Sequence, residues 1–342
     1  MCREELSWGD TEVVARNRYA PDRGLSFRMG LTLFLLGLLY VVLMGLLLAL
    51  GFSWWLVLLI AVGALFAQWY FSDSIALYSM GAAEVTPEQA PQLHGVIDRL
   101  CAMADMPKPR VAIADTDMPN AFATGRSPNR SVVCVTTGLL RRLDGEELEG
   151  VLSHELSHVA HRDVLVMTLA SVAGVVAGFL TRMMLWGGMT RGRDQNAFVV
   201  GLAIIAVSAV VYVLSFLLTR LLGRYRELAA DRAGALLTGQ PSALARALVK
   251  VSGDMGSIPT SDLRKAEPVN AFFFAPALSG RKSIASLFDT HPPLEKRLEQ
   301  LSAISAQLGQ SSGTLQELVS PAEPMGLPPA SEAPGDASGA GS

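Results

Sequence analysis

The sequence predicts a mainly α-helical membrane protein, with four transmembrane helices and a cytosolic α+β domain. Two observations lead to this fold class. Of the 342 residues, 50% are hydrophobic and only 17% are charged, and the mean hydropathy of +0.35 is too high for an ordinary soluble protein. Long uncharged apolar stretches also alternate with polar segments that carry both helix and strand signals.

Charge and cysteine content narrow the function. The formal net charge of -3, without a basic run that contains aromatic residues, argues against a nucleic-acid partner. The cysteines (Cys2, Cys101 and Cys134) form no Cys-x-x-Cys pair, so neither a disulfide framework nor a thiolate metal site is expected. This cysteine usage fits a reducing cytoplasm.

A first transmembrane hairpin is expected at residues 31–71, after a polar cytosolic segment at 1–28. No charged side chain occurs from Met29 to Ser72, which is long enough for two crossings of roughly 20 residues each. Gly51-Phe52-Ser53 divides the stretch into helices at about 31–50 and 54–71. Arginines precede the hairpin and charged residues follow it, so the positive-inside rule places both ends in the cytoplasm.

Residues 73–163 are expected to form the first half of the cytosolic domain. Thr86-Pro87 predicts a helix that runs to about Met103, on which His94 would be an ordinary surface histidine. Residues 110–114 and 120–124 are expected to be short strands, and a β-branched run after turn signals predicts a further strand at 131–136. An exposed edge of such a sheet could bind a peptide as an additional strand. The alternative is that residues 120–125 form a purely structural hairpin.

The most informative motif is Ser153-His154-Glu155-Leu156-Ser157-His158. On a helix, His154 and His158 lie on one face and can bind a single metal ion, with the Glu155 carboxylate beside it. Asp144 and Glu147 match a capping box at the start of this helix, which supports the helical interpretation. A chance match on a buried helix is the alternative.

A second transmembrane hairpin is expected at 164–219, with helices at about 164–181 and 197–219. Val164 to Thr181 and Gln195 to Thr219 contain no charged residue, although the first stretch is only just long enough to cross. A buried core helix is the alternative for that stretch. If both helices cross, residues 220–308 return to the side of the histidine pair and form the second half of the domain.

A catalytic zinc site needs a third protein ligand and keeps a fourth position for water. Glu227 is the best candidate, and Asp231, one helical turn later, could orient a ligand histidine or compete as the ligand. His161 is less suitable, because on one straight helix it would lie about 10 Å from His154 along the axis. Asp163 is expected to cap or orient a group at the membrane surface.

Four features together resemble the HtpX branch of the membrane-integrated zinc metallopeptidases, a family that also contains the CAAX prenyl endopeptidases. The resemblance extends over about residues 30–308. The features are Asn120-Ala121-Phe122-Ala123-Thr124-Gly125, His154-Glu155-Leu156-Ser157-His158 with Asp163, Glu227-Leu228-Ala229-Ala230-Asp231, and Thr290-His291-Pro292-Pro293-Leu294-Glu295-Lys296-Arg297.

The resemblance implies a gluzincin-like zinc protease domain that faces the cytoplasm from a multi-pass protein of the bacterial inner membrane. It further implies a role in membrane-protein quality control and stress response, with misfolded or surplus membrane proteins, or peptides, as substrates in the lipid bilayer. The residues it assigns have distinct roles. It implies that one Zn²⁺ ion is bound by His154, His158 and Glu227 and that Arg297 lies near the active site. Glu155 beside the metal is expected to be the general base, and Asp231 and Asp163 are expected to support the ligands by their spacing. The substrate cleft is lined by Asn120, Ala121, Phe122, Ala123, Thr124 and Gly125.

By the same resemblance, His291 lies near the active site. It would either help to hold the substrate carbonyl oxygen or be a structural histidine of the core. Two other functions remain open: a CAAX-type prenyl-protein endopeptidase and a non-cleaving zinc-binding scaffold or chaperone. Glu155 argues against the scaffold, and a metal transporter is disfavoured because the candidate ligands lie outside the apolar stretches.

The composition changes to Ser, Gly, Pro, Ala and Glu at 309–342, which predicts a disordered tail. This tail could be a tether or a handle for other membrane quality-control proteases, although a featureless tail is the preferred interpretation. The segment 252–290 could cover the cleft.

Overall fold

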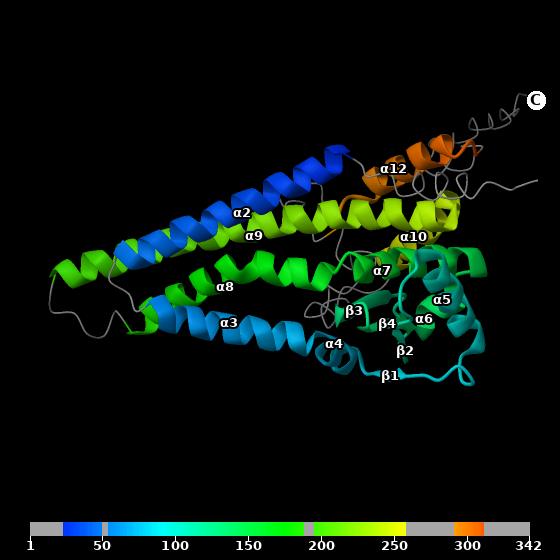
Figure 1. Ribbon diagram of the computed structural model, residues 1–342, viewed down its shortest axis with the longest axis horizontal. Coiled ribbons are helices and arrows are strands. Elements are labelled where there is room, and N and C mark those ends of the chain that lie inside the picture. The colour runs from blue at the N-terminus through cyan, green and yellow to red at the C-terminus, as the bar shows by residue number, and fades with distance from the viewer. Residues whose placement is uncertain (1–22, 50–53, 188–194, 258–290, 311–342) are drawn as a thin grey trace, which may run out of the picture.

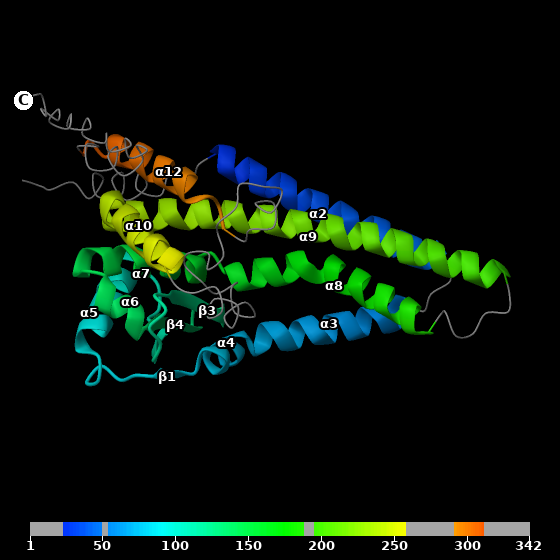
Figure 2. The same ribbon diagram turned by 180° about the vertical axis from the view of Figure 1, so that it is seen from behind.

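The computed structural model describes residues 23–49, 54–187, 195–257 and 291–310. Within these residues, long helices extend from one end of the molecule, and a sheet with shorter helices lies at the other end (Figures 1 and 2). The long helices are α2 (Arg23–Ala49), α3 (Trp54–Tyr70), α8 (Asp163–Gly187) and α9 (Gln195–Thr238). The predictions for residues before 23, for 258–290 and for the tail from 311 lie outside the described residues.

The long helices pair side by side, with α2 along α9 and α3 along α8 (Figure 1). Two of them, over Arg23–Leu43 and Gly201–Thr238, are long and apolar enough to cross a membrane. A third candidate in the described part of the chain is the pair α7 and α8, which is bent by 56°. Four crossings therefore stay a prediction. Helix α2 begins at Arg23 rather than at about 31.

Helix α9 continues without a break from its apolar part into the domain that carries the sheet. Its uncharged part ends at Thr219, and Arg220, Arg224 and Arg226 follow. The part of α9 that is apolar enough to cross a membrane therefore ends before Arg220. Glu227 lies beyond this point, on the polar part of the same helix.

The sheet has the strand order β1-β2-β4-β3, with β3 at one edge. Strand β2 pairs in parallel with β4, and β3 pairs antiparallel with β4. The predicted strands are confirmed, although β3 extends further than expected. The strands are β1 (Ala82–Glu84), β2 (Arg110–Ala114), β3 (Ala121–Ser127) and β4 (Arg130–Thr136).

Shorter helices lie around the sheet, and all of them except the one at Ser72–Met80 share its main apolar core, which includes Ile97, Val133, Leu152, Leu248 and Leu301. They are α4 (Ser72–Met80), α5 (Pro91–Ala104), α6 (Thr137–Arg142), α7 (Gly145–Ala160), α10 (Pro241–Ser257) and α12 (Leu294–Gln307). Helix α7 carries the histidine motif and contacts both α9 and β3.

Two predictions for α5 are wrong. The helix begins at Pro91 rather than at Pro87, because Thr86 and Gln89 close a turn with two hydrogen bonds, of 2.8 and 3.0 Å. His94 is not a surface histidine, since only 6% of it is exposed and its Nε2 lies 3.0 Å from the carbonyl oxygen of Val85. The amphipathic face of α5 that packs on the core includes this histidine.

The predicted capping box of α7 is confirmed. The Glu147 side chain accepts from the backbone N–H of Asp144 at 3.1 Å, and the Asp144 side chain accepts from the N–H of Glu147 at 2.9 Å. Glu147 is also 2.7 Å from Nζ of Lys250 on α10. These contacts fix the start of the helix and its position against α10.

Helix α9 approaches α7 closely where Gly234 faces the histidine motif. A Cβ at Gly234 would lie 2.9 Å from the backbone nitrogen of His154 and 2.9 Å from Oγ of Ser153. Such distances are shorter than real Cβ contacts, so only glycine permits this approach. Gly234 lies two helical turns after Glu227 and thus sets how near Glu227 comes to α7.

Candidate active site

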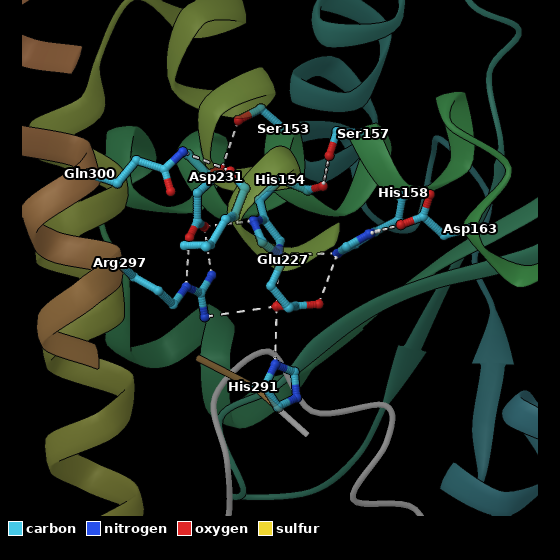
Figure 3. A network of polar contacts seen from close by, with 12 residues as sticks. Ser153, His154, Ser157, His158, Asp163, Glu227, Asp231, His291, Arg297 and Gln300 are labelled. Atoms are coloured by element: carbon cyan, nitrogen blue, oxygen red, sulfur yellow. Dashed lines mark hydrogen bonds and ion pairs between the residues drawn. The ribbon is translucent and has the colours of Figure 1, made fainter. Parts of the chain in front are cut away.

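The side chains of His154, His158 and Glu227 converge on one point between α7 and α9 (Figure 3). The two Nε2 atoms are 3.2 Å apart, and Glu227 Oε1 lies 3.4 Å from Nε2 of His158. Glu227 Oε2 lies 3.7 Å from Nε2 of His154. Tetrahedral zinc with bonds of about 2.0–2.1 Å separates neighbouring ligand atoms by about 3.3 Å. The distance between the two nitrogens, and the distance from each nitrogen to one of the two Glu227 oxygens, are therefore close to those expected for three ligands of a zinc ion.

Both histidines are held by carboxylates through their other ring nitrogen. Nδ1 of His154 lies 2.9 Å from Oδ1 of Asp231, and Nδ1 of His158 lies 2.7 Å from Oδ2 of Asp163 (Figure 3). A carboxylate at Nδ1 favours the tautomer that carries its proton there and leaves Nε2 free to bind a metal. Asp231 and Asp163 are thus placed to orient the candidate ligands.

Arg297 on α12 holds Asp231 with a two-pronged ion pair. Its Nε and Nη2 donate to the two Asp231 oxygens at 2.7 and 2.6 Å, and both side chains are buried. Burial by itself would raise the pKa of Asp231, but the Arg297 charge and hydrogen bonds outweigh it and lower that pKa. Asp231 therefore remains an anion that can accept the Nδ1–H of His154.

Asp163 has a partner that the sequence did not single out. Arg226 on α9 forms an ion pair with it and also lies 3.4 Å from the carbonyl oxygen of His161. The guanidinium is buried, so it compensates the charge of a carboxylate that has left water. The one sequence feature that could have pointed to Arg226 is its position directly before the candidate ligand Glu227.

Glu155 lies beside the three converging side chains without being one of them. It is buried, and its Oε2 accepts a hydrogen bond of 3.1 Å from the backbone N–H of Ala123 on the edge strand β3. Burial raises the pKa of Glu155 above that of an ordinary glutamate. The carboxylate thus lies between the candidate metal position and the strand edge, where a proton acceptor is useful.

His291, just before α12, lies at the same point. Its Nδ1 is 3.0 Å from Oε2 of Glu227, and the ring is buried (Figure 3). Burial opposes ionisation of Glu227, but His291 and His154 outweigh it and hold the pKa of Glu227 well below its usual range. The structure therefore brings His291 to the candidate site rather than to a separate part of the core. Nη1 of Arg297 is 4.0 Å from the same Glu227 oxygen.

A cleft of about 830 Å³ contains this cluster. Ala121 to Gly125 line it, as do His154, Glu155, His158 and Glu227. Asn120 is a correction, because it is fully buried and is not among the lining residues. Its backbone instead bonds to Thr136. The N–H of Asn120 donates to the Thr136 hydroxyl at 2.9 Å, and the carbonyl oxygen of Asn120 accepts from the N–H of Thr136 at 2.9 Å. The cleft also continues along α8 and α9, which the sequence did not reveal.

Comparisons with known proteins identify the family of the chain. Residues 87–305 match peptidase family M48. The chain is 58% identical over 297 residues to "Protease HtpX homolog 1" of Streptomyces coelicolor. The match covers 86% of this chain and 98% of that protein. It is 50% identical over 295 residues to "Protease HtpX homolog" of Moorella thermoacetica, with coverage of 86% and 98%.

A solved structure is also similar. The crystal structure of S. mikatae Ste24p matches with a TM-score of 0.50 and 15% sequence identity. The match covers 86% of this chain and 66% of Ste24p, so the chain corresponds to somewhat less than two thirds of that protein. At this identity the similarity concerns the fold alone.

Proposed function

The chain belongs to peptidase family M48, and on that premise we propose that it is a membrane-bound zinc metalloendopeptidase. Its substrates would be misfolded or surplus membrane proteins, cut at the cytosolic face of the bacterial inner membrane. The observation that carries the proposal is the convergence of His154, His158 and Glu227, with the Glu155 carboxylate directly beside them and outside the set.

Each residue has a defined task in the proposed reaction. His154, His158 and Glu227 would hold one Zn²⁺ ion, which when bound supplies Lewis acidity for peptide hydrolysis. Glu155 would accept a proton from the attacking water and deliver it to the leaving amine, a role that suits a buried carboxylate of raised pKa.

The remaining residues would position these groups and the substrate. Asp231 and Asp163 keep the two histidines oriented, because each carboxylate faces an Nδ1 atom. Strand β3 lies at the edge of the sheet, so a substrate could pair with it in an extended conformation. His291 would then donate a hydrogen bond to the substrate carbonyl oxygen as negative charge develops there.

The proposed membrane topology has four crossings, with both halves of the protease domain, 73–163 and 220–308, on the cytosolic side. Helix α9 supports this topology, because its uncharged part leads directly to the arginines and to Glu227. Helix α8 begins at Asp163, only a few residues after His158. The candidate site would therefore lie close to the lipid boundary, where membrane-anchored substrates are within reach.

The test compares the parent with Glu155→Gln on a membrane-anchored peptide, at equal zinc content measured by metal analysis. We expect the parent to cleave and the variant to bind zinc without cleaving. Zinc binding without cleavage by either protein would contradict the protease and favour a zinc-binding scaffold. A strict requirement for a prenylated cysteine in the peptide would instead favour a prenyl-protein endopeptidase.

A further inference from the structure

The cleft has an extension that leads from the candidate metal ligands along the two long helices α8 and α9. We call this extension the arm, and define it by Met167, Gly174, Val175, Gly178, Tyr212 and Phe216. On α9 its lining recurs at helical spacing from Tyr212 to Glu227, so the arm and the candidate ligand share one face of the helix. A helix of this extent measures about 22 Å.

Helix α2 covers a different face of the same two helices. Leu39 and Leu43 of α2 pack against Val176 and Ala177 of α8 and Val211 of α9. The arm residues Gly174 and Gly178 point away from this cluster, by the helical spacing of their positions. Among the described residues, none from α2 or α3 lines the cleft.

The wall of the arm is apolar in character, although several hydroxyl groups lie along it. Ser171 donates to the carbonyl oxygen of Thr168 at 2.8 Å, and Thr219 donates to that of Ala170 at 3.2 Å. These hydroxyls are therefore satisfied within the protein and leave an apolar surface. Arg220 lies along the same helix, and its guanidinium is 4.4 Å from the centre of the Phe216 ring.

Two glycines of α8 line the arm and lie against side chains of α9. A Cβ at Gly174 would lie 3.0 Å from Oγ of Ser215, and one at Gly178 would lie 3.5 Å from the Tyr212 ring. At these two positions α8 therefore presents bare backbone to α9.

The dimensions favour an extended chain over a helix. A helix about 10 Å wide and 22 Å long occupies roughly 1,700 Å³, whereas the whole cleft, which also contains the candidate metal ligands, has a volume of only about 830 Å³. An extended chain rises about 3.3 Å per residue, so about seven residues would run the length of the arm. At the other end of the cleft, the edge strand β3 also suits an extended chain.

We propose that the arm binds an extended apolar segment of the substrate protein, immediately next to the scissile bond. This proposal rests on the proposed protease function and adds a specificity to it. Cleavage would be favoured where a hydrophobic stretch of about seven residues adjoins the cut. The physical reason is that burying the apolar side chains of such a segment against the mainly apolar wall of the arm is favourable, and the arm is continuous with the catalytic residues.

Three variants on α8 test this. Val175→Trp fills the arm at a residue that is 41% exposed, and Gly178→Leu fills it from a second position. Leu169→Trp is the matched control, because Leu169 is 57% exposed on the same helix and does not line the cleft. Metal content is measured for each full-length protein.

The substrates are two peptides with the same cleavable core, one of which continues into about seven leucine and valine residues. We expect the parent and Leu169→Trp to prefer the apolar peptide about tenfold in kcat/KM. Val175→Trp and Gly178→Leu should abolish this preference while cleaving the short peptide normally. Three results would overturn the proposal. The parent could show no preference for the apolar peptide, both variants could keep that preference, or the variants could lose activity equally on both peptides while retaining full metal content.

A binding measurement separates this proposal from the protease function. The apolar peptide carries a photoreactive phenylalanine in its hydrophobic segment and is cross-linked to the full-length protein with Glu155→Gln. Cross-links to α8 and α9 that disappear with Val175→Trp support the arm even if the parent cleaves neither peptide. Cross-links that Val175→Trp leaves unchanged, or that a phospholipid probe displaces from the arm, overturn it.

Discussion

Arg297 donates two hydrogen bonds to Asp231, of 2.7 and 2.6 Å, and Oδ1 of Asp231 lies 2.9 Å from Nδ1 of His154. These contacts join α12 to α9, and α9 to α7, the helix that carries the histidines (Figure 3). A residue far along the chain thereby controls the orientation of a candidate metal ligand. The pair is fully buried, so its removal should affect both folding and metal binding.

Replacing Arg297 by Met should leave the Asp231 charge buried without its partner. We expect the unfolding free energy to fall by about 3–5 kcal/mol and the zinc affinity to fall about 10–100-fold. Thermal unfolding in detergent and competition with a metal indicator measure the two effects. Arg297→Lys is the control, since it keeps the charge but loses the two-pronged geometry, and should be affected less. Unchanged zinc affinity in Arg297→Met would contradict the orienting role of the pair.

Gly234→Ala should force α9 away from α7, because its Cβ would meet the His154 backbone at 2.9 Å. Glu227 on the same face of α9 would then move away from the two histidines, and we expect zinc affinity to fall about tenfold. A Co²⁺-substituted sample should show a changed visible absorption spectrum. Gly95→Ala, where a Cβ would meet open space in α5, should instead add about 0.5–1 kcal/mol to stability. Identical Co²⁺ spectra for parent and Gly234→Ala would disprove the spacing argument.

Asp163→Asn should weaken zinc binding about tenfold, because His158 loses the anion at its Nδ1 atom. It also leaves the buried Arg226 without its charged partner, so stability should fall by about 3 kcal/mol. Adding Arg226→Met should restore much of the stability but none of the zinc affinity. Isothermal titration with zinc and thermal unfolding distinguish the two roles, and a joint recovery of both quantities would argue that Asp163 acts only through Arg226.

Removal of metal by a chelator should lower the thermal stability of the parent. A ligand at a thousand times its Kd stabilises the folded state by about 4 kcal/mol, which chelation takes away. His154→Ala should show little response to the chelator, because one of three converging donors is missing. Glu155→Gln should respond like the parent, since Glu155 lies outside that set. A chelator response in His154→Ala equal to that of the parent would place the metal elsewhere.

Much of the fold follows from local patterns in the sequence. The capping box of Asp144 and Glu147 and the spacing of His154 and His158 act within one or two helical turns, so sequence alone specifies them. The strand at 131–136 is specified by its β-branched residues after a turn, and a strand at 110–114 is also expected from the sequence. Helical spacing also places Glu227 and Asp231 on one face of a helix.

Packing between distant elements decided the rest. Several contacts depend on how helices lie against one another. They are the ion pair of Arg297 with Asp231, the ion pair of Arg226 with Asp163, the burial of His94 and the close approach of α9 to α7 at Gly234. The arm of the cleft exists only because α8 and α9 run side by side with α2 on another face. Sequence periodicity identifies the faces of a helix, but not which distant face it meets, because that depends on the close packing of the whole chain.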